Sequence, residues 1–156
     1  MKERYGDSTR TVKAADTEGI PGQPVGHTPV PASAFHLCAD EGTEEHVYGR
    51  YSNPVWTRLQ AALAQLEEAT TALCFGSGMA AVSAALRVLC RPGAVLVVPA
   101  DGYYQVRRYA AESLAPLGVT VREATADEMC DAARDADVVL AETPTNPGLD
   151  VVDLHR

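Results

Sequence analysis

Apolar and polar residues alternate in blocks along the second half of the chain. Three short apolar runs predict buried strands, over residues 94–98, 119–123 and 137–142. Between these runs, apolar residues recur at helical spacing and predict a helix over 103–117 that ends at Gly118. A second helix is predicted after Thr125, which forms a capping box with Glu128. Strands that alternate with helices predict the α/β class, with a mostly parallel sheet and flanking helices.

Two further helices are predicted earlier in the chain, before the first of these strands. Asn53 and Pro54 suit the N-cap and the first helical position, and leucines at helical spacing after them predict a helix over 54–68. The apolar run 71–75 predicts a short buried strand. The Gly-Ser-Gly turn after this run predicts that a further helix begins near Gly78.

The beginning of the chain has a different composition. Residues 19–31, "GIPGQPVGHTPVP", contain so much Gly and Pro that neither a helix nor a central strand can persist there, which predicts an extended segment. We therefore divide the chain into an N-terminal arm, residues 1–52, and the N-terminal part of an α/β domain, residues 53–156.

Composition and charge exclude several classes of partner. With 156 residues and 46% hydrophobic content the chain can bury one core, and its net charge of −8 offers no basic patch for nucleic acid or anionic membranes. The N-terminus has no apolar signal core, and no run is long enough to span a bilayer. The cysteines and histidines lack the spacing of disulfides or metal ligands, so we expect reduced core cysteines, solvated or structural histidines, no metal and a cytoplasmic protein. These residues are Cys38, Cys74, Cys90, Cys130, His27, His36, His46 and His155.

Polar segments follow the predicted strands. These segments are Gly76–Gly78, Asp101–Tyr104 and Glu142–Pro147. The carboxyl ends of parallel strands meet at one edge of a sheet, so the three segments are expected at the same rim. Glycines at a helix start bind phosphate, and a tyrosine can stack on a ring. The set therefore suits a flat, phosphorylated aromatic ligand.

The glycine turn leaves other interpretations open. Residues 76–81, "GSGMAA", also fit the dinucleotide fingerprint G-x-G-x-x-A, with Asp101 as a possible ribose partner. A dinucleotide would leave "ETPTNP", residues 142–147, unexplained. The turn is also compatible with a tight strand-to-helix connection that binds nothing.

Four motifs in register resemble one enzyme family. They are "YGRYSNP" from Tyr48, "GSGMAA" from Gly76, an aspartate shortly before Tyr103, and "ETPTNP" from Glu142. In order and spacing they resemble the Cys/Met-metabolism family of pyridoxal-phosphate enzymes, over about Ser8 to the last residue. The resemblance implies the fold-type I architecture of PLP-dependent transferases, present here as its N-terminal part only and preceded by the arm.

The resemblance also assigns the site and pyridoxal 5′-phosphate as cofactor. Backbone N–H groups of Gly78 and Met79 would hold the cofactor phosphate, Tyr103 would stack on the pyridine ring, and Glu142 and Asn146 would belong to the network around the 3′-oxygen of the ring. Tyr103 is also the residue that the resemblance assigns to catalysis. The implied cofactor-binding residues are Tyr48, Arg50, Ser77, Gly78, Met79, Tyr103, Glu142 and Asn146. Tyr48 and Arg50 would reach the phosphate of a neighbouring subunit, because the planar fork of arginine meets two phosphate oxygens.

The family acts on sulfur amino acids, so the resemblance implies transsulfuration chemistry. The expected function is elimination or replacement at the γ-carbon, like a cystathionine γ-lyase, on substrates of the cystathionine, homocysteine or cysteine class. Cystathionine γ-synthase and methionine γ-lyase are the alternatives, and Gln105 stands where methionine γ-lyases often have cysteine. The implied assembly is a homo-oligomer, a dimer of dimers, or a pair with a complementing C-terminal chain.

The lysine that links covalently to the cofactor is the main departure. The resemblance places it, and the aspartate that pairs with the pyridine nitrogen, beyond "VVDLHR", and the lysines of this chain are Lys2 and Lys13 in the arm. An exposed lysine is protonated at neutral pH and is not a nucleophile. We therefore expect an inactive chain in isolation, as a truncated, split or fragmentary enzyme. The alternative of another class is a non-catalytic half-protein that binds a partner chain.

Overall fold

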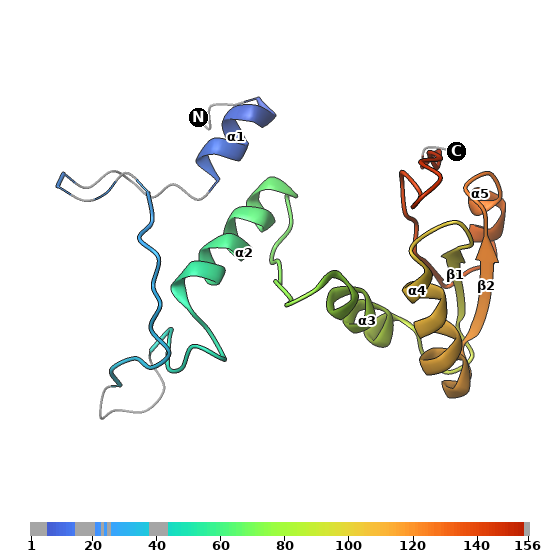
Figure 1. Ribbon diagram of the computed structural model, residues 1–156, viewed down its shortest axis with the longest axis horizontal. Coiled ribbons are helices and arrows are strands. Elements are labelled where there is room, and N and C mark those ends of the chain that lie inside the picture. Colours follow the sequence, from blue (N-terminus) through green and yellow to red (C-terminus); the bar gives the residue numbers. More distant parts are fainter. Residues whose placement is uncertain (1–5, 15–20, 23, 25, 38–43, 155–156) are drawn as a thin grey trace. The chain divides into compact units, whose positions relative to one another are not determined.

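The computed structural model describes residues 6–14, 21–22, 24, 26–37 and 44–154 (Figure 1). The chain forms two compact units, residues 1–74 and 75–156, which we describe separately. Lys2, Cys38 and His155 lie outside the described residues. The predicted boundary between arm and domain at residue 53 concerns the fold of the complete protein and stays a prediction.

A three-stranded parallel sheet is the centre of the unit 75–156. Its strands, in the order β2-β1-β3, are β1 (Val95–Pro99), β2 (Thr120–Ala124) and β3 (Val138–Val139). Both neighbours of β1 run parallel to it, with Leu96 opposite Val121 on one side and Val138 on the other. The predicted parallel sheet is therefore confirmed, although β3 is shorter than the six-residue run.

Helices cover both faces of β1. Leu96 and Val98 point into a core shared with three helical segments, and Val97 points into a second core with α5 (Met129–Ala133). The three segments are α3 (Gly78–Leu89), α4 (Tyr104–Tyr109) and the π-helical turn η1 (Ala110–Leu114). Side chains alternate across a strand, so a fully apolar strand such as β1 must be covered on both sides. Figure 1 shows α4 over β1 and β2. The flanking helices predicted from the sequence are confirmed.

The helix predicted over 103–117 is irregular. After α4 and η1 it ends in a single 3₁₀ turn, η2 (Ala115–Leu117). Gly118 follows with φ 88°, in the left-handed region that glycine adopts without strain. The predicted stop at Gly118 is confirmed.

The capping box predicted at Thr125 forms only in part. The Glu128 carboxylate accepts hydrogen bonds from the N–H of Thr125 at 3.0 Å and from its hydroxyl at 2.9 Å, and these bonds lower the pKa of Glu128. The threonine hydroxyl donates to Glu128, and no N–H of α5 donates to it among the described residues. α5 begins at Met129, later than the sequence predicts.

The unit 1–74 contains α1 (Asp7–Lys13) and α2 (Pro54–Leu66). Asn53 is the N-cap of α2: its side-chain oxygen accepts from the N–H of Val55 at 2.9 Å, and its amide donates to Val30 O at 3.0 Å. The helix start at Asn53-Pro54 is thus confirmed, whereas α1 was not predicted. The described residues within 19–31 contain no helix or strand, as the composition predicts. No described helix has the length and apolar character needed to cross a bilayer.

The strand predicted over 71–75 is wrong. These residues have no regular structure, and Leu73 is 75% and Phe75 46% exposed. A strand requires a neighbouring strand for its backbone hydrogen bonds, and none of the described residues pairs with this segment. Its apolar composition is suited to a strand, but the described part of the chain provides no partner.

The expectation of reduced core cysteines is met in part. Cys74, Cys90 and Cys130 are free thiols, but only Cys90 among these three is buried. Burial, with a smaller contribution from the nearby Asp137 carboxylate, raises the pKa of the Cys90 thiol. Cys74 belongs to the exposed segment 71–75, and its expected core position is wrong.

Because β1 is the centre of both cores, we predict that Leu96→Ala lowers the free energy of unfolding of this unit by about 2–5 kcal/mol. Leu96 is 0% exposed, so its truncation leaves a cavity. The matched control is Val88→Ala on the surface of α3, where Val88 is 77% exposed and the change is expected within about 0.5 kcal/mol. Urea unfolding followed by circular dichroism measures both variants, and equal midpoints would contradict the assignment of β1 as the core strand.

Candidate functional site

The N-terminus of α3 carries the predicted phosphate turn. Ser77 is the N-cap, and its hydroxyl accepts from the N–H of Ala80 at 3.1 Å. The N–H groups of Gly78 and Met79 have no acceptor within the described residues. A Cβ placed at Gly76 or at Gly78 would meet nothing within 4 Å. The turn therefore presents two backbone donors and open space, which suits an anion.

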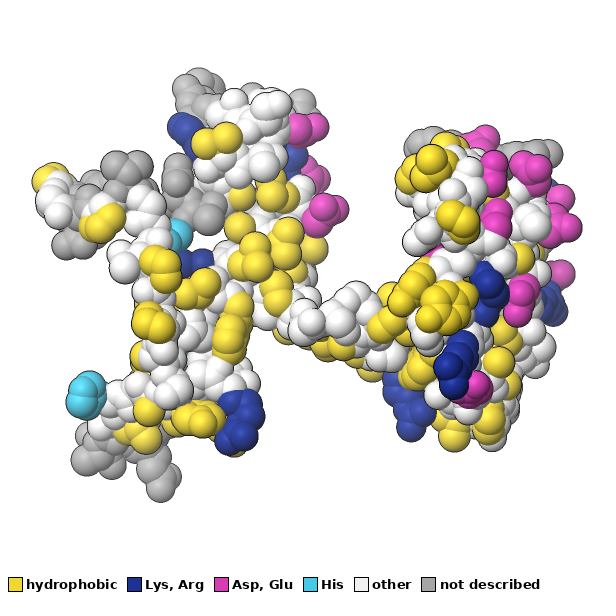
Figure 2. All heavy atoms as spheres, viewed as in Figure 1, with side chains coloured by type: hydrophobic (Ala, Val, Ile, Leu, Met, Phe, Trp, Pro, Cys, Tyr) yellow, Lys and Arg dark blue, Asp and Glu magenta, His cyan; other side chains and the backbone are white. Residues whose placement is uncertain are grey.

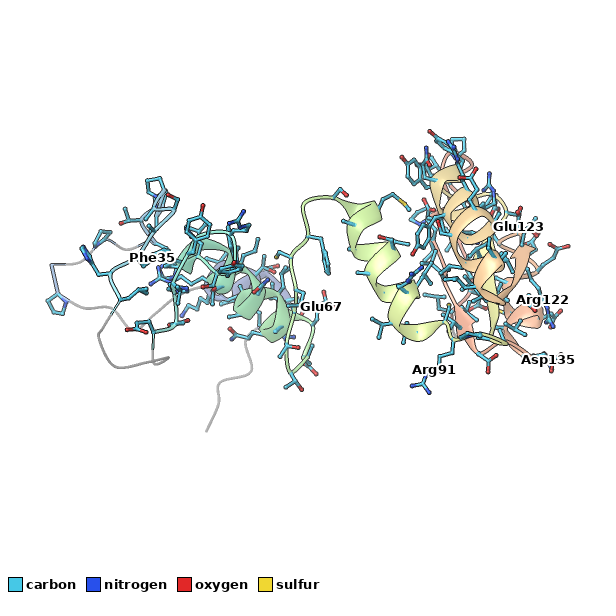
Figure 3. The ribbon with its side chains drawn as sticks, turned by 90° about the horizontal axis from the view of Figure 1, so that it is seen from below. Phe35, Glu67, Arg91, Arg122, Glu123 and Asp135 are labelled. Atoms are coloured by element: carbon cyan, nitrogen blue, oxygen red, sulfur yellow. The ribbon has the colours of Figure 1, made fainter. Side chains whose placement is uncertain are left out.

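The connection from α3 to β1 fixes the direction of this helix. After α3, the turn at 90–94 leads directly into β1, and the N–H of Gly93 donates to Gly118 O at 2.8 Å. In Figure 3, Arg91 marks the C-terminal end of α3. The C-terminus of α3 thus lies beside the amino ends of β1 and β2.

The segment after β1 is joined to the segment after β3. The backbone N–H of Tyr103 donates to Glu142 Oε2 at 2.7 Å. The ring of Tyr103 is 41% exposed and lies edge-on to Tyr104, with ring centroids 5.3 Å apart. The structure therefore brings two predicted site residues together and leaves the ring of Tyr103 accessible.

Two further side chains hold the loop between β1 and α4. Arg107 Nη1 donates to Gly102 O at 3.0 Å and to Pro99 O at 3.3 Å. Asp101 Oδ2 accepts from the N–H of Ala126, after β2, at 3.3 Å, and so links this loop to the segment after β2. Asp101 Oδ1 is a buried oxygen without a partner among the described residues. The arrangement gives the dinucleotide interpretation no support.

The loop after β3 is held by its threonines. Thr145 is buried, and its hydroxyl accepts from the N–H of Asp150 at 3.0 Å. The Thr143 hydroxyl accepts from the N–H of Val152 at 3.1 Å, and both X-Pro bonds of the loop are cis. Between these anchors, Asn146 is exposed. Its side chain is therefore accessible to a ligand.

Tyr48 and Arg50 lie in the other unit, on a turn that packs against residues 32–34 of the same arm. Gly49 N donates to Ser33 O at 2.8 Å, and a Cβ at Gly49 would approach Ala32 O to 3.1 Å, so a side chain here would require the neighbouring backbone to shift. The Arg50 guanidinium lies 5.0 Å from the ring centroid of Tyr48 and 5.8 Å from that of Tyr51. Within the described ranges, Arg50 has no carboxylate partner, so its charge is available to an anion.

Exposed acidic side chains are found on β2 and α5. Figure 2 shows acidic side chains gathered over β2 and α5, where Glu123, Asp127 and Asp131 are exposed.

Arg107 and Gly102 shape the loop before α4 but were not predicted from the sequence as site residues. The only signal for Arg107 is its position one helical turn after Tyr103, and Gly102 differs from other glycines only through its tertiary contacts.

Comparison with known proteins shows the family of the chain. Residues 9–156 match the family described as Cys/Met metabolism PLP-dependent enzymes. The chain belongs to this family. The resemblance carried by the four motifs is thereby confirmed, and the family uses pyridoxal phosphate as its cofactor. This match leaves the roles of single residues untested.

Curated relatives cover nearly all of the chain. A Streptomyces coelicolor protein assigned as a cystathionine γ-lyase is 41% identical over 97% of the chain, and the cystathionine γ-synthase of Mycobacterium leprae is 33% identical over 96%. The chain spans only 40% and 41% of their lengths. It corresponds to the N-terminal portion of the family's enzymes.

Solved structures agree with the fold. The cystathionine γ-synthase of Xanthomonas oryzae pv. oryzae, in complex with aminoacrylate and cysteine, has a TM-score of 0.80 at 27% identity, over 96% of this chain and 40% of that one. A Micromonospora echinospora protein, described both as a methionine γ-lyase and as a cystathionine γ-lyase, is 32% identical, and the latter structure has a TM-score of 0.77 over 96% of this chain and 40% of that one. The fold-type I architecture predicted from the resemblance is confirmed.

The residues of this family member fit its cofactor. The turn at Gly76–Gly78 offers unpaired donors and free space to a phosphate, and Tyr103 offers an accessible ring face to a pyridine. When bound, pyridoxal phosphate supplies an electron sink for chemistry at the carbons of an amino acid. The turn at Gly76–Gly78 and the ring of Tyr103 would bind and orient such a group. The lysine that would link to it has no counterpart in the unit 75–156, which contains no lysine.

Proposed function

We propose that this chain is the cofactor-binding N-terminal portion of an enzyme of sulfur amino-acid metabolism, which catalyses elimination or replacement at the γ-carbon as a cystathionine γ-lyase does. The observation that carries the proposal is that the N–H groups of Gly78 and Met79 have no acceptor within the described residues and lie on the same unit as the exposed Tyr103. The 41% identity to the Streptomyces coelicolor relative favours the lyase. Cystathionine γ-synthase and methionine γ-lyase are the alternatives within the family.

Each site residue has a task in this proposal. Ser77 orders the first turn of α3, and Gly78 and Met79 donate to the cofactor phosphate. Tyr103 stacks on the pyridine ring, and Asn146 donates to its 3′-oxygen. The substrate belongs to the class of cystathionine, homocysteine or cysteine. Cystathionine is present in a structure of the Xanthomonas oryzae pv. oryzae synthase, which supports this class.

The assembly is part of the proposal. Tyr48 and Arg50 reach the cofactor phosphate of a neighbouring subunit, so the active unit is at least a two-fold dimer, and a dimer of dimers when complete. The exposed guanidinium of Arg50, which lies 5.0 Å from the ring centroid of Tyr48 and 5.8 Å from that of Tyr51, suits this task. The cytoplasm, predicted from the spacing of the cysteines, is the proposed compartment.

Tyr103 provides the first test, in the complete enzyme that carries this chain. Tyr103→Ala is expected to weaken cofactor binding by about 1 kcal/mol, because the stacking face is lost, whereas Tyr103→Phe keeps most of the affinity. The control is Tyr104→Ala, which removes the exposed neighbouring ring. Titration with pyridoxal phosphate, followed by absorbance, measures all three variants. Equal losses for the Phe and Ala variants would contradict stacking.

Arg50 tests the contribution across the interface. We expect Arg50→Ala to weaken cofactor retention by about 1.5–3 kcal/mol, the range for a hydrogen bond to a charged group. Arg87→Ala removes an exposed arginine of α3 and serves as the control. Dialysis against buffer without cofactor, combined with analytical ultracentrifugation, provides both readouts. A monomeric, fully active holoenzyme would rule the assignment out, as would normal retention by the Arg50 variant.

The lysines test whether the 156-residue chain is active alone. Lys13 lies on the exposed surface of α1, and Lys2 lies outside the described residues, so we expect weak cofactor binding without a specific covalent link and no γ-elimination. The chain is incubated with pyridoxal phosphate, reduced with borohydride and mapped by mass spectrometry. Stoichiometric labelling of either lysine together with turnover would contradict the proposal. A downstream reading frame that encodes Ser-x-x-Lys would favour the enzyme over a non-catalytic half-protein that binds a partner chain.

A further inference from the structure

We propose that Glu142 is a positioning residue, which fixes the backbone of Tyr103 and thereby orients the stacking ring. This inference rests on the proposed function, because it concerns the same cofactor site. It differs from the assignment implied by the resemblance, in which Glu142 belongs to the network around the 3′-oxygen of the ring. The contact that carries it is the hydrogen bond from Tyr103 N to Glu142 Oε2, 2.7 Å long.

The sheet register explains why these two residues meet. β1 and β3 are parallel neighbours, with Val97 opposite Val139 and a hydrogen bond of 2.9 Å from Leu140 N to Val97 O. The chain leaves both strands at the same edge. Glu142 therefore follows β3 at the level where the loop after β1 turns into α4.

The bond to Glu142 completes the fixation of the Tyr103 backbone. Tyr103 is the N-cap of α4, and its carbonyl accepts from the N–H of Val106 at 3.0 Å. Its own N–H has no helical acceptor, because the first donors of a helix lack partners within the helix. Glu142 supplies that acceptor, so both backbone polar groups of Tyr103 are bonded while its ring stays exposed.

The surroundings of Gly102 show that the Glu142 carboxylate lies in a tightly packed space. A Cβ at Gly102 would lie 2.6 Å from Glu142 Oε2 and 2.5 Å from Pro99 Cγ. Gly102 is buried, and its carbonyl accepts from Arg107 Nη1 at 3.0 Å. Glycine is therefore required at this position for the carboxylate to reach the N–H of Tyr103.

Hydrogen exchange on the cofactor-free complete enzyme tests the contact directly. Glu142→Ala is expected to accelerate exchange of the Tyr103 amide about tenfold or more, since a bond to a charged acceptor is lost. The Val106 amide, bonded to Tyr103 O, provides an internal comparison. Glu142→Gln keeps a carbonyl acceptor and restores most of the protection, and Glu112→Ala, which removes the exposed carboxylate paired with Arg108, leaves it unchanged. Equal exchange of the Tyr103 amide in wild type and Glu142→Ala would overturn the proposal.

A double-mutant cycle on cofactor affinity separates positioning from direct contact. If Glu142 acts through the ring of Tyr103, Glu142→Ala weakens binding in the wild-type background and has little further effect in Tyr103→Ala. Equal losses in both backgrounds would overturn the proposal in favour of direct contact or a general loss of structure. If Tyr103→Ala alone binds normally, the proposed stacking fails, and the exchange of the Tyr103 amide still decides whether Glu142 fixes this backbone.

Gly102→Ala is a second variant that leaves the carboxylate in the chain. Its methyl group would displace Glu142 Oε2, so the Tyr103 amide should exchange as fast as in Glu142→Ala. Thermal unfolding of each variant, followed by circular dichroism, shows whether the unit remains folded. A folded Gly102→Ala protein that keeps full protection of the Tyr103 amide would contradict the inference that the Glu142 carboxylate needs the space beside Gly102.

Discussion

The burial of β1 on both faces is the constraint on which the unit 75–156 depends. Its central residues are fully buried and contact helices on either side. Both neighbouring strands run parallel to it, and parallel strands need crossover connections, which here contain helical segments. All strand ends then meet at one edge, where the loop before Tyr103 meets Glu142. The site thus lies at the edge where the loops that follow these parallel strands come together.

Local signals were sufficient for the elements whose causes are local. Asn53-Pro54 and Ser77-Gly78 begin helices because a side-chain oxygen accepts from a first-turn N–H, and Gly118 ends one because it adopts a left-handed conformation. The capping box at Thr125 was predicted incorrectly in part, because its hydroxyl donates to Glu128 instead of accepting from the helix. A local pattern fixes which residues interact, but not which of them donates.

The site could be predicted only as a set of segments. Residue types at the strand ends indicate a phosphate and a ring, and the family motifs assign the residues to them. The partner of the Tyr103 N–H, the space around Gly102 and the contact of Asp101 with Ala126 depend on strand register, which no single segment encodes. The same reasoning explains the error at 71–75, whose composition is suited to a strand but whose partner is not among the described residues.

That unpaired segment affects how the isolated chain behaves in solution. Leu73 and Phe75 are exposed, and the backbone of residues 71–75 has no hydrogen-bond partner among the described residues. Such a segment accepts any extended strand that approaches it, including the same segment of another molecule. At high concentration, the 156-residue chain is therefore expected to self-associate through residues 71–75, and a charged substitution at Leu73 would be the simplest way to keep it dispersed.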